Sequence, residues 1–330
     1  MSDLPAVTLQ RALAQLLGDD GGAQVVEELG GGTYNHVLGA RLGDGREVVV
    51  KVSPSSDAPG LSYEGDLLRT EAEYFRLALG QGAPVPQVVA YSEALLPGRA
   101  VLVLSRLQGT NLSEASRSIN TAATLRVLGE LGEAVGRVHG LSASGFGYPF
   151  RQQRFWHGSW SDAFGAMLAA LIDDADRFAV DLPVPARRLQ EFVQACRPAL
   201  DEVTVPALVH FDLWDGNLLV GAPSGGSRLS GIVDAERAMY ADPAFELPSL
   251  ALSRALDREG GFLAGYARAG RAFEPTASLE ARVALYTVYL YLVMLVEAAP
   301  RHYPKADAKR NRDRCVSAIA SQLAMLTHRA

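Results

Sequence analysis

The sequence predicts an α+β fold of two lobes, in which an N-terminal antiparallel sheet carries one main helix and the C-terminal lobe is mostly helical. Short apolar segments separated by Gly-rich turns predict the sheet, and longer segments with helical spacing predict the second lobe. Two apolar runs within residues 209–234 each lead to an acidic residue. We assign residues 1–106 to the N-terminal lobe and residues 107–330 to the C-terminal lobe, with a hinge at about 104–110.

Composition and charge exclude several classes of function. A chain of 330 residues can bury a large core, and 48% hydrophobic and 21% charged residues are typical of a soluble globular protein. The formal net charge of −6 and the lack of a long Lys/Arg block argue against a nucleic-acid partner. The two cysteines, Cys196 and Cys315, predict neither a disulfide framework nor a zinc site.

The sequence also gives expectations about location. The N-terminus lacks the basic and apolar regions of a secretory signal. The apolar run 283–296 is shorter than the roughly 20 residues that span a bilayer, and Arg282 and Glu297 flank it. We therefore expect a buried core helix at this run, a cytoplasmic protein and no membrane partner. We also expect a monomer or a homodimer.

The first elements of the N-terminal lobe are predicted as a helix at 8–17 and strands at 25–29, 37–42 and 47–52. Between the first two strands lies a Gly-rich segment, G-G-G-T-Y-N-H-V. Glycines there let the backbone approach phosphate groups and offer them N–H donors. The candidates for nucleotide binding in this segment are Gly30, Gly31, Gly32 and Asn35. The alternative is a Gly-rich hairpin turn that binds no ligand.

The next strand, R-E-V-V-V-K-V, carries Lys51 after three valines. A lysine at this point, after a Gly-rich hairpin, is typical of a strand that brings an ammonium group to the α- and β-phosphates of a nucleotide. The alternative is a lysine on the open face of an ordinary alternating strand. A helix predicted at 65–79 contains Glu71 and Glu73 as possible ion-pair partners. We favour Glu71, which precedes an aromatic pair by one turn.

The apolar strand predicted at 100–110 runs into a Gln-Gly turn. A buried strand that leads to a polar turn suits a hinge between lobes, where the chain around Leu104 and Arg106 could hold the edge of an adenine ring. A plain strand and loop is the alternative. The C-terminal lobe is predicted as helices at 121–141, from a cap at Ser161, around 189–200, and at about 248–270, 278–298 and 304–328.

The segment V-H-F-D-L-W-D-G-N-L-L-V contains Asp212 and Asn217 with D-x-x-x-x-N spacing, and Asp234 ends a later apolar run. This spacing, followed by a second aspartate, is found in kinase catalytic loops. The chemistry requires these residue types: one aspartate orients and deprotonates an acceptor hydroxyl, while the asparagine and the second aspartate hold Mg²⁺ against the nucleotide phosphates.

In their order along the chain, these motifs resemble those of the aminoglycoside phosphotransferase family, the small-molecule kinases of the protein-kinase-like fold. H-F-D-L-W-D-G-N is similar to the family's H-G-D-x-x-x-x-N, and V-D-A-E-R-A-x-x-x-D-P-x-x-E-L is similar to I-D-W-E-x-A-x-x-G-D-P-x-x-D-L. The resemblance implies an ATP- and Mg²⁺-dependent phosphotransferase with Asp212 as catalytic base. It further implies metal ligands at Asn217 and Asp234, and a phosphate-binding Lys51 paired with Glu71.

The sequence departs from the family pattern at three positions, since Phe211, Ala235 and Ala241 replace the usual Gly, Trp and Gly. These changes remove no charged catalytic group. Only a short segment separates Asp234 from Asp242, so a protein kinase that is regulated by phosphorylation of a long activation loop is not expected.

Carboxylates and aromatic rings near the catalytic loop suit an acceptor with a protonated amine, through ion pairs and cation–π contacts. We therefore expect a hydroxylated amine, an amino sugar or an aminoglycoside. The acceptor-binding candidates are Asp215, Glu236, Trp214 and Trp160, with Trp156, Asp162 and the acidic run 173–176 as further possibilities. A solvated helix face is the alternative for the acidic run, and a surface pair with Arg237 is the alternative for Glu236.

Two other functions remain open at this stage. The motif that contains Trp214 also resembles that of ketosamine repair kinases, which act on fructosamine-type compounds. A kinase-like protein that binds a nucleotide without transferring phosphate usually lacks one catalytic group, whereas Lys51, Asp212 and Asp234 are all present here.

Overall fold

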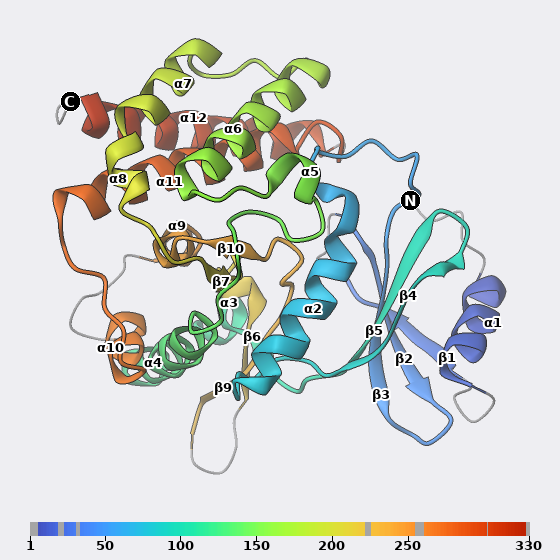
Figure 1. Ribbon diagram of the computed structural model, residues 1–330. Coiled ribbons are helices and arrows are strands. Elements are labelled where there is room, and N and C mark those ends of the chain that lie inside the picture. Colours follow the sequence, from blue (N-terminus) through green and yellow to red (C-terminus); the bar gives the residue numbers. More distant parts are fainter. Residues whose placement is uncertain are drawn as a thin grey trace.

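A computed structural model describes residues 6–18, 23–30, 34–221, 226–254, 261–301 and 303–327. It consists of a sheet lobe and a helical lobe, and α2 lies between them (Figure 1). The predicted α+β architecture, with an antiparallel N-terminal sheet and a helical C-terminal lobe, is confirmed.

The N-terminal lobe is built on a five-stranded antiparallel sheet with the strand order β1-β2-β3-β5-β4. Its elements are α1 (Ala6–Leu17), β1 (Ala23–Glu28), β2 (His36–Leu42), β3 (Glu47–Val52), η2 (Glu64–Asp66), α2 (Leu67–Gly80), β4 (Val88–Leu96) and β5 (Arg99–Ser105). Side chains alternate between the two faces of a strand. Val48, Val50 and Val52 therefore share one core cluster with α1, whereas Lys51 points to the opposite face and contacts α2.

The chain passes from the sheet to the helical lobe after Ser105. β5 ends there, earlier than the predicted end at residue 110, because its ladder with β3 ends at the Val48–Ser105 pair. The chain then reaches β6 (Thr110–Asn111), which pairs with β8 of the second lobe. The hinge at 104–110 and the lobe boundary at residue 106 remain our proposal.

The remaining elements form the helical lobe. They are α3 (Leu112–Ala115), α4 (Thr121–Val138), α5 (Gln152–Phe155), α6 (Trp160–Arg177), α7 (Ala186–Ala195), α8 (Arg197–Asp201), β7 (Ala207–Val209), η3 (Asp215–Asn217), β8 (Leu218–Gly221), β9 (Arg228–Ile232), β10 (Met239–Ala241), η4 (Pro243–Glu246), α9 (Leu247–Leu250), α10 (Phe262–Arg268), α11 (Ala277–Val296) and α12 (Lys305–Thr327).

Two small sheets position the predicted catalytic segments. β7 pairs with β10, and β8 lies between β6 and β9. The segment that joins β7 to β8 contains Asp212, and the segment that joins β9 to β10 contains Asp234. These segments lie side by side, because the N–H of Val233 donates to the carbonyl oxygen of Asn217 at 3.0 Å.

Three predicted helix boundaries in this lobe are wrong. Ser159, not Ser161, caps α6, since its hydroxyl accepts from the N–H of Asp162 at 3.2 Å. The helix predicted around 189–200 is two helices, because Pro198 lacks the N–H that would continue α7. The helix predicted at 248–270 contains α9 and α10, and residues 255–260 lie outside the described part of the chain.

The helix α11 is long and apolar enough, by length and composition alone, to cross a membrane, and 56% of its apolar window is buried inside the protein. It packs against α6, α8, α9 and α12. The rings of Tyr286 and Tyr289 lie on Phe164 and Phe245, within the main core. The expectation of a buried core helix at 283–296 is confirmed.

Close packing of α4 against α10 depends on Gly132. A Cβ atom at this position would lie 2.0 Å from the carbonyl oxygen of Phe262 and 2.8 Å from the backbone nitrogen of Tyr266. Gly165 in α6 has no atom within 4 Å of a built Cβ and is a matched control. We expect Gly132→Ala to lower the free energy of unfolding by about 2 kcal/mol, whereas Gly165→Ala should raise it through helix propensity. Urea unfolding measures both, and shifts of the same sign would contradict this packing.

Candidate active site

Residues from both lobes meet at Lys51. Its ammonium nitrogen lies 2.7 and 2.9 Å from the two carboxylate oxygens of Glu71 and 2.6 Å from Oδ1 of Asp234. The predicted pairing with Glu71 is confirmed, and Glu73 instead lies 3.8 Å from Arg76. Burial alone would lower the pKa of Lys51, but Asp234 and Glu71 raise it well above its ordinary value. The lysine therefore carries its full charge at the point where the lobes touch.

The backbone of the catalytic loop is held by one buried carboxylate. Glu246 accepts the N–H of His210 and, at 2.9 Å, the N–H of Phe211. Phe211 has a φ of 65°, a conformation that is costly for a residue with a Cβ atom. Its ring stacks on Phe245 with centroids 4.1 Å apart. The stacking contact and the two hydrogen bonds maintain the turn where the family pattern usually has glycine.

His210 links the two catalytic segments. Its Nδ1 accepts the N–H of Asp212 at 3.3 Å, which assigns the ring proton to Nε2, and Nε2 then donates to the carbonyl oxygen of Val233 at 3.1 Å. Burial lowers the pKa of His210, so the neutral form predominates. The edge of the ring meets Tyr74 of α2, with centroids 5.2 Å apart. His210 thus supports the loop and is not itself placed to transfer a proton.

Asp212 and Asn217 are in direct contact. The amide nitrogen of Asn217 donates to the backbone oxygen of Asp212 at 2.9 Å and to Oδ2 of Asp212 at 3.1 Å. Burial raises the pKa of Asp212 to about 6, although the charge of Arg237 acts in the opposite direction. A carboxylate with a pKa close to neutrality suits a general base. Because the amide nitrogen of Asn217 is engaged, its oxygen is the atom left to bind a cation.

The residues present fit a hard divalent cation. Carboxylate oxygens of Glu71, Asp234 and Glu236 all lie within 4.8 Å of one another, and oxygen ligands are those that Mg²⁺ prefers. Burial alone would raise the pKa of Asp234, but Lys51 lowers it, so this carboxylate is ionised. Burial and the charge of Asp234 raise the pKa of Glu236 to about 8. Asp234 and Asn217 both line two cavities between the lobes, so an ion bound to Asp234 would lie within this cleft.

A cavity of about 610 Å³ between the sheet and β8 matches the predicted nucleotide site. Gly30, Leu104 and Arg106 line it, together with Lys51, Glu71, Asn217 and Asp234. Arg106 also forms an ion pair with Glu27 at 2.5 Å. Gly31 and Gly32 lie outside the described residues. Asn35, also predicted for nucleotide binding, instead lines a second cavity, and its amide donates to Glu236 of the second lobe at 2.5 Å.

A second cavity of about 410 Å³ extends from Asp212 into the helical lobe. Trp214 and Glu236 line it, as predicted for acceptor-binding residues, and Trp214 also lines the nucleotide cavity. Arg237 does not form the alternative surface pair with Glu236. It is buried and contacts Glu297 at 2.6 Å.

Sequence reasoning missed this arginine–glutamate network. Arg301 bridges Glu297, at 3.1 Å, and Glu64, at 2.7 Å. Its members come from three distant segments, so no local spacing could identify the set. Glu246 was also not assigned a role, although it lies in the D-P-x-x-E-L motif, which could have pointed to it.

Two acceptor-binding predictions are wrong. Trp160 is 0% exposed and donates its indole N–H to the hydroxyl of Tyr286 at 2.6 Å, within the aromatic core. Its helical neighbours are apolar, so the ring belongs to the core face of α6. Asp215 is buried against Arg254, whose Nε lies 3.2 Å away, and it lines neither cavity.

The weaker acceptor candidates also lie elsewhere. Asp162 pairs with Arg197 and Asp173 with Arg154, while Asp174 accepts from Ser62. Trp156 packs edge-on against Tyr240. None of these side chains, nor that of Asp176, is among the described residues that line the second cavity.

Comparisons with known proteins agree with this arrangement. A family model described as the phosphotransferase enzyme family matches residues 25–286. No curated protein sequence matches the chain. Among solved structures, a protein assigned as fructosamine-3-kinase from Thermobifida fusca is 21% identical, with a TM-score of 0.66 over 96% of this chain and 98% of that chain.

Two further solved structures share the fold. The GDP complex of aminoglycoside 2′-phosphotransferase-IIIa is 17% identical, with a TM-score of 0.63 over 96% of this chain and 99% of that chain. A microcompartment-associated aminopropanol kinase is 17% identical, with a TM-score of 0.55 over 98% of this chain and 97% of that chain. At these identities, the likeness shows the fold alone.

Proposed function

This chain belongs to the phosphotransferase enzyme family, and on that premise we propose that it transfers the γ-phosphoryl group of ATP, with Mg²⁺, to a hydroxyl group of a small molecule. The observation that carries the proposal is the convergence at one cleft of Lys51, paired with Glu71 and Asp234, with the Asp212–Asn217 pair. A kinase-like protein without transfer activity is not favoured, because the lysine and both aspartates occupy one connected cleft.

The proposed roles follow from the contacts of each residue. Lys51 lies between the lobes and would bind the α- and β-phosphates, while Glu71 holds its ammonium group in place. Asn217 and Asp234 would hold Mg²⁺, which supplies positive charge that offsets the phosphate oxygens. Asp212 would accept the proton of the acceptor hydroxyl, and it is held in the wall of the second cavity by its contact with Asn217, which lines both cavities.

For the acceptor, we propose a hydroxylated amine or amino sugar. Glu236 and Glu297 are the carboxylates on the described wall of the second cavity besides the catalytic aspartates, and Trp214 offers an aromatic face. A protonated amine beside Glu236 would favour the charged form of this carboxylate, because opposite charges lower a carboxyl pKa. The aminoglycoside 2′-phosphotransferase and the aminopropanol kinase among the similar structures are named for acceptors of this kind, which supports the choice.

A ketosamine is the second candidate acceptor. Two observations favour it: the likeness to the protein assigned as fructosamine-3-kinase, and the position of Trp214 at the junction of both cavities. A ketosamine also carries an amine and several hydroxyl groups, so the same carboxylates could bind it. Activity measurements on both classes are needed to decide between them.

The proposal is tested by ADP release with Mg²⁺-ATP against aminoglycosides, amino sugars, amino alcohols, nucleosides and fructosamine-type compounds. GTP is tested in parallel, because similar structures contain GDP. We expect turnover with at least one hydroxylated amine. Turnover confined to neutral or acidic acceptors would contradict the acceptor class, and failure to bind either nucleotide would contradict the phosphotransferase proposal.

The two tryptophans should respond oppositely to substitution. Trp214 is 39% exposed at the cavity junction, so Trp214→Ala is expected to raise the KM for the accepted substrate about tenfold without lowering stability. Trp160 is in the core, so Trp160→Phe should leave this KM unchanged and cost about 1–2 kcal/mol of unfolding free energy. Steady-state kinetics and urea unfolding check both variants. A raised KM in Trp160→Phe would instead indicate that Trp160 contributes to acceptor binding.

A further inference from the structure

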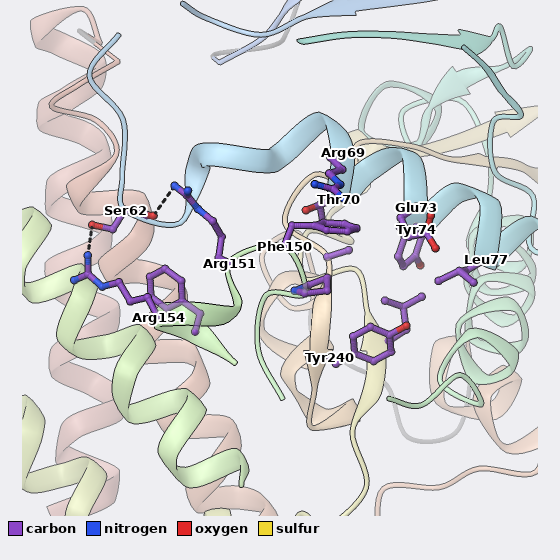
Figure 2. Close-up of a pocket in the computed structure, with 14 residues that line it drawn as sticks. Ser62, Arg69, Thr70, Glu73, Tyr74, Leu77, Phe150, Arg151, Arg154 and Tyr240 are labelled. Carbon is purple, nitrogen blue, oxygen red and sulfur yellow. Dashed lines mark hydrogen bonds between the residues drawn. The ribbon is translucent and has the colours of Figure 1, made fainter. Parts of the chain in front are cut away.

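A cavity of about 930 Å³, larger than either cleft cavity, lies against α2 (Figure 2), and Glu71 is not among the residues that line it. We refer to it as the rear cavity. α2 contributes Arg69, Thr70, Glu73, Tyr74 and Leu77 to its wall, and the opposite wall comes from the segment 149–155 and from Leu208, Ala238 and Tyr240. None of these residues lines the nucleotide or acceptor cavities, so the proposed transfer reaction leaves the rear cavity unused.

The wall of the rear cavity is polarised. Arg151 and Arg154 gather near Ser62 at one end, whereas Leu77 and Tyr240 lie at the other (Figure 2). Arg69 lies between these ends. Glu73 is the carboxylate among the lining residues, and it lies 3.8 Å from Arg76. Three guanidinium groups and one carboxylate line this wall, and the acids that pair with Arg151 and Arg154, Asp66 and Asp173, lie outside the lining, so the wall itself favours an anion.

The guanidinium groups retain hydrogen-bonding capacity. Arg69 has one carboxylate neighbour, Glu93 at 4.0 Å, and both side chains are about half exposed, so this pair contributes little. In Arg151, Nε is buried 3.6 Å from a carboxylate oxygen of Asp66 and Nη2 donates to the carbonyl oxygen of Ser62 at 3.3 Å, which leaves Nη1 without a hydrogen-bond partner among the described residues. Guanidinium N–H groups donate to the oxygens of a carboxylate with favourable geometry.

The rear cavity also contains a flat apolar surface next to the arginines. The guanidinium of Arg69 stands 4.2 Å over the ring of Phe150, which fixes both groups. Phe155, Tyr240 and Leu77 continue the wall away from the arginines. An aromatic ring in this space would gain stacking and burial contacts.

Tyr74 connects the rear cavity to the catalytic loop. The residue is 2% exposed, lines the cavity, and its hydroxyl makes no hydrogen bond to another residue in the described part of the chain. Because this hydroxyl makes no hydrogen bond within that part of the chain, an occupant of the cavity could supply a partner for it. The same ring meets the edge of His210, which holds Asp212.

We propose that the rear cavity is a binding site for a small planar aromatic acid. Its carboxylate contacts Arg69 and Arg151, and its ring lies toward Leu77 and Tyr240. The site is separate from the nucleotide and acceptor cavities, and an occupant would contact Tyr74 directly.

The probe for this site is 2-naphthoate, measured by isothermal titration calorimetry with and without Mg²⁺-ADP. We expect saturable binding in both conditions, and binding of the neutral 2-naphthamide to be weaker by about tenfold or more. Leu77→Trp should fill the cavity and weaken naphthoate binding by about tenfold or more. Leu79→Trp is the matched control, because Leu79 is on the same helix but is exposed to solvent, and its affinity should stay within about twofold of the wild type.

The proposal is overturned by a lack of saturable naphthoate binding, by equal affinity for acid and amide, or by unchanged affinity in Leu77→Trp. If Leu77→Trp is not folded by thermal denaturation, Arg69→Gln replaces it, with Arg76→Gln as its control on the same helix. Loss of affinity in the Arg69 variant alone supports the site, and equal affinity in the two variants overturns it. Calorimetry requires no turnover, so this result is independent of the acceptor and of the proposed transfer reaction.

Discussion

An Asp212→Asn variant is expected to lose kcat by about 10³-fold, the scale on which a positioned general base contributes. Asparagine has the same shape, so the contact with Asn217 and the loop conformation should persist. Nucleotide binding should persist as well, because Asp212 does not line the nucleotide cavity, whereas Lys51 and Asp234 do. The measurement is ADP release at saturating acceptor, together with nucleotide affinity by calorimetry.

The matched control is Asp201→Asn. Asp201 is a half-exposed aspartate 3.6 Å from Arg197 and is not among the residues that line the two cleft cavities, so its removal should leave kcat within about twofold of the wild type. If Asp212→Asn keeps wild-type kcat while its nucleotide affinity is unchanged, Asp212 is not the base. A parallel loss of nucleotide affinity would instead indicate a disturbed cleft.

The second large effect is expected at Glu246. Glu246→Ala removes the acceptor for two buried backbone N–H groups, those of His210 and Phe211, and leaves a hole beside the left-handed turn. Two charge-assisted hydrogen bonds and the uncompensated donors together make the expected loss about 4 kcal/mol of unfolding free energy. Urea unfolding measures this loss. Activity should fall in the folded fraction too, since Asp212 directly follows these two residues.

Glu133→Ala is the control for this experiment. Glu133 is a partly exposed glutamate that pairs with Arg137 at 3.0 Å, a surface pair whose removal should cost less than about 1 kcal/mol. Equal destabilisation by the two substitutions would show that Glu246 does not hold the catalytic loop. If Glu246→Ala lowers stability but leaves activity normal, Glu246 stabilises the fold without positioning Asp212.

The sequence was sufficient to predict the structure wherever a local pattern had only one physical explanation. Alternation along β3 places Lys51 on the face opposite the valine core. Glu71 lies one helical turn before an aromatic pair, and this position directs its side chain toward Lys51. The D-x-x-x-x-N spacing likewise brings Asp212 and Asn217 into contact, because both lie in one short loop between β7 and β8. The α+β architecture followed from the change in periodicity along the chain.

Sequence patterns failed where two interpretations of a residue differ only in whether its side chain is buried or exposed. Trp160 and Trp214 are both tryptophans predicted to bind the acceptor, yet one is 0% and the other 39% exposed. Asp215 lies in the same loop as Asp212, but its carboxylate accepts a hydrogen bond from Arg254 and does not line the acceptor cavity. The helix limits at 189–200 and 248–270 also failed, because Pro198 interrupts the first segment and, in the second, α9 ends at Leu250 well before α10 begins at Phe262.

The sequence by itself therefore determined the fold class, the family motifs and the groups that meet at Lys51, because each depends on periodicity or on short spacing. Only the tertiary structure decided which side chains form the acceptor wall, that Arg237 pairs with Glu297 and Glu297 with Arg301, and that Glu246 holds the catalytic loop. These contacts join segments far apart in the chain. Their partners are selected by burial, since a charge or backbone donor removed from water must find a partner wherever the fold supplies one.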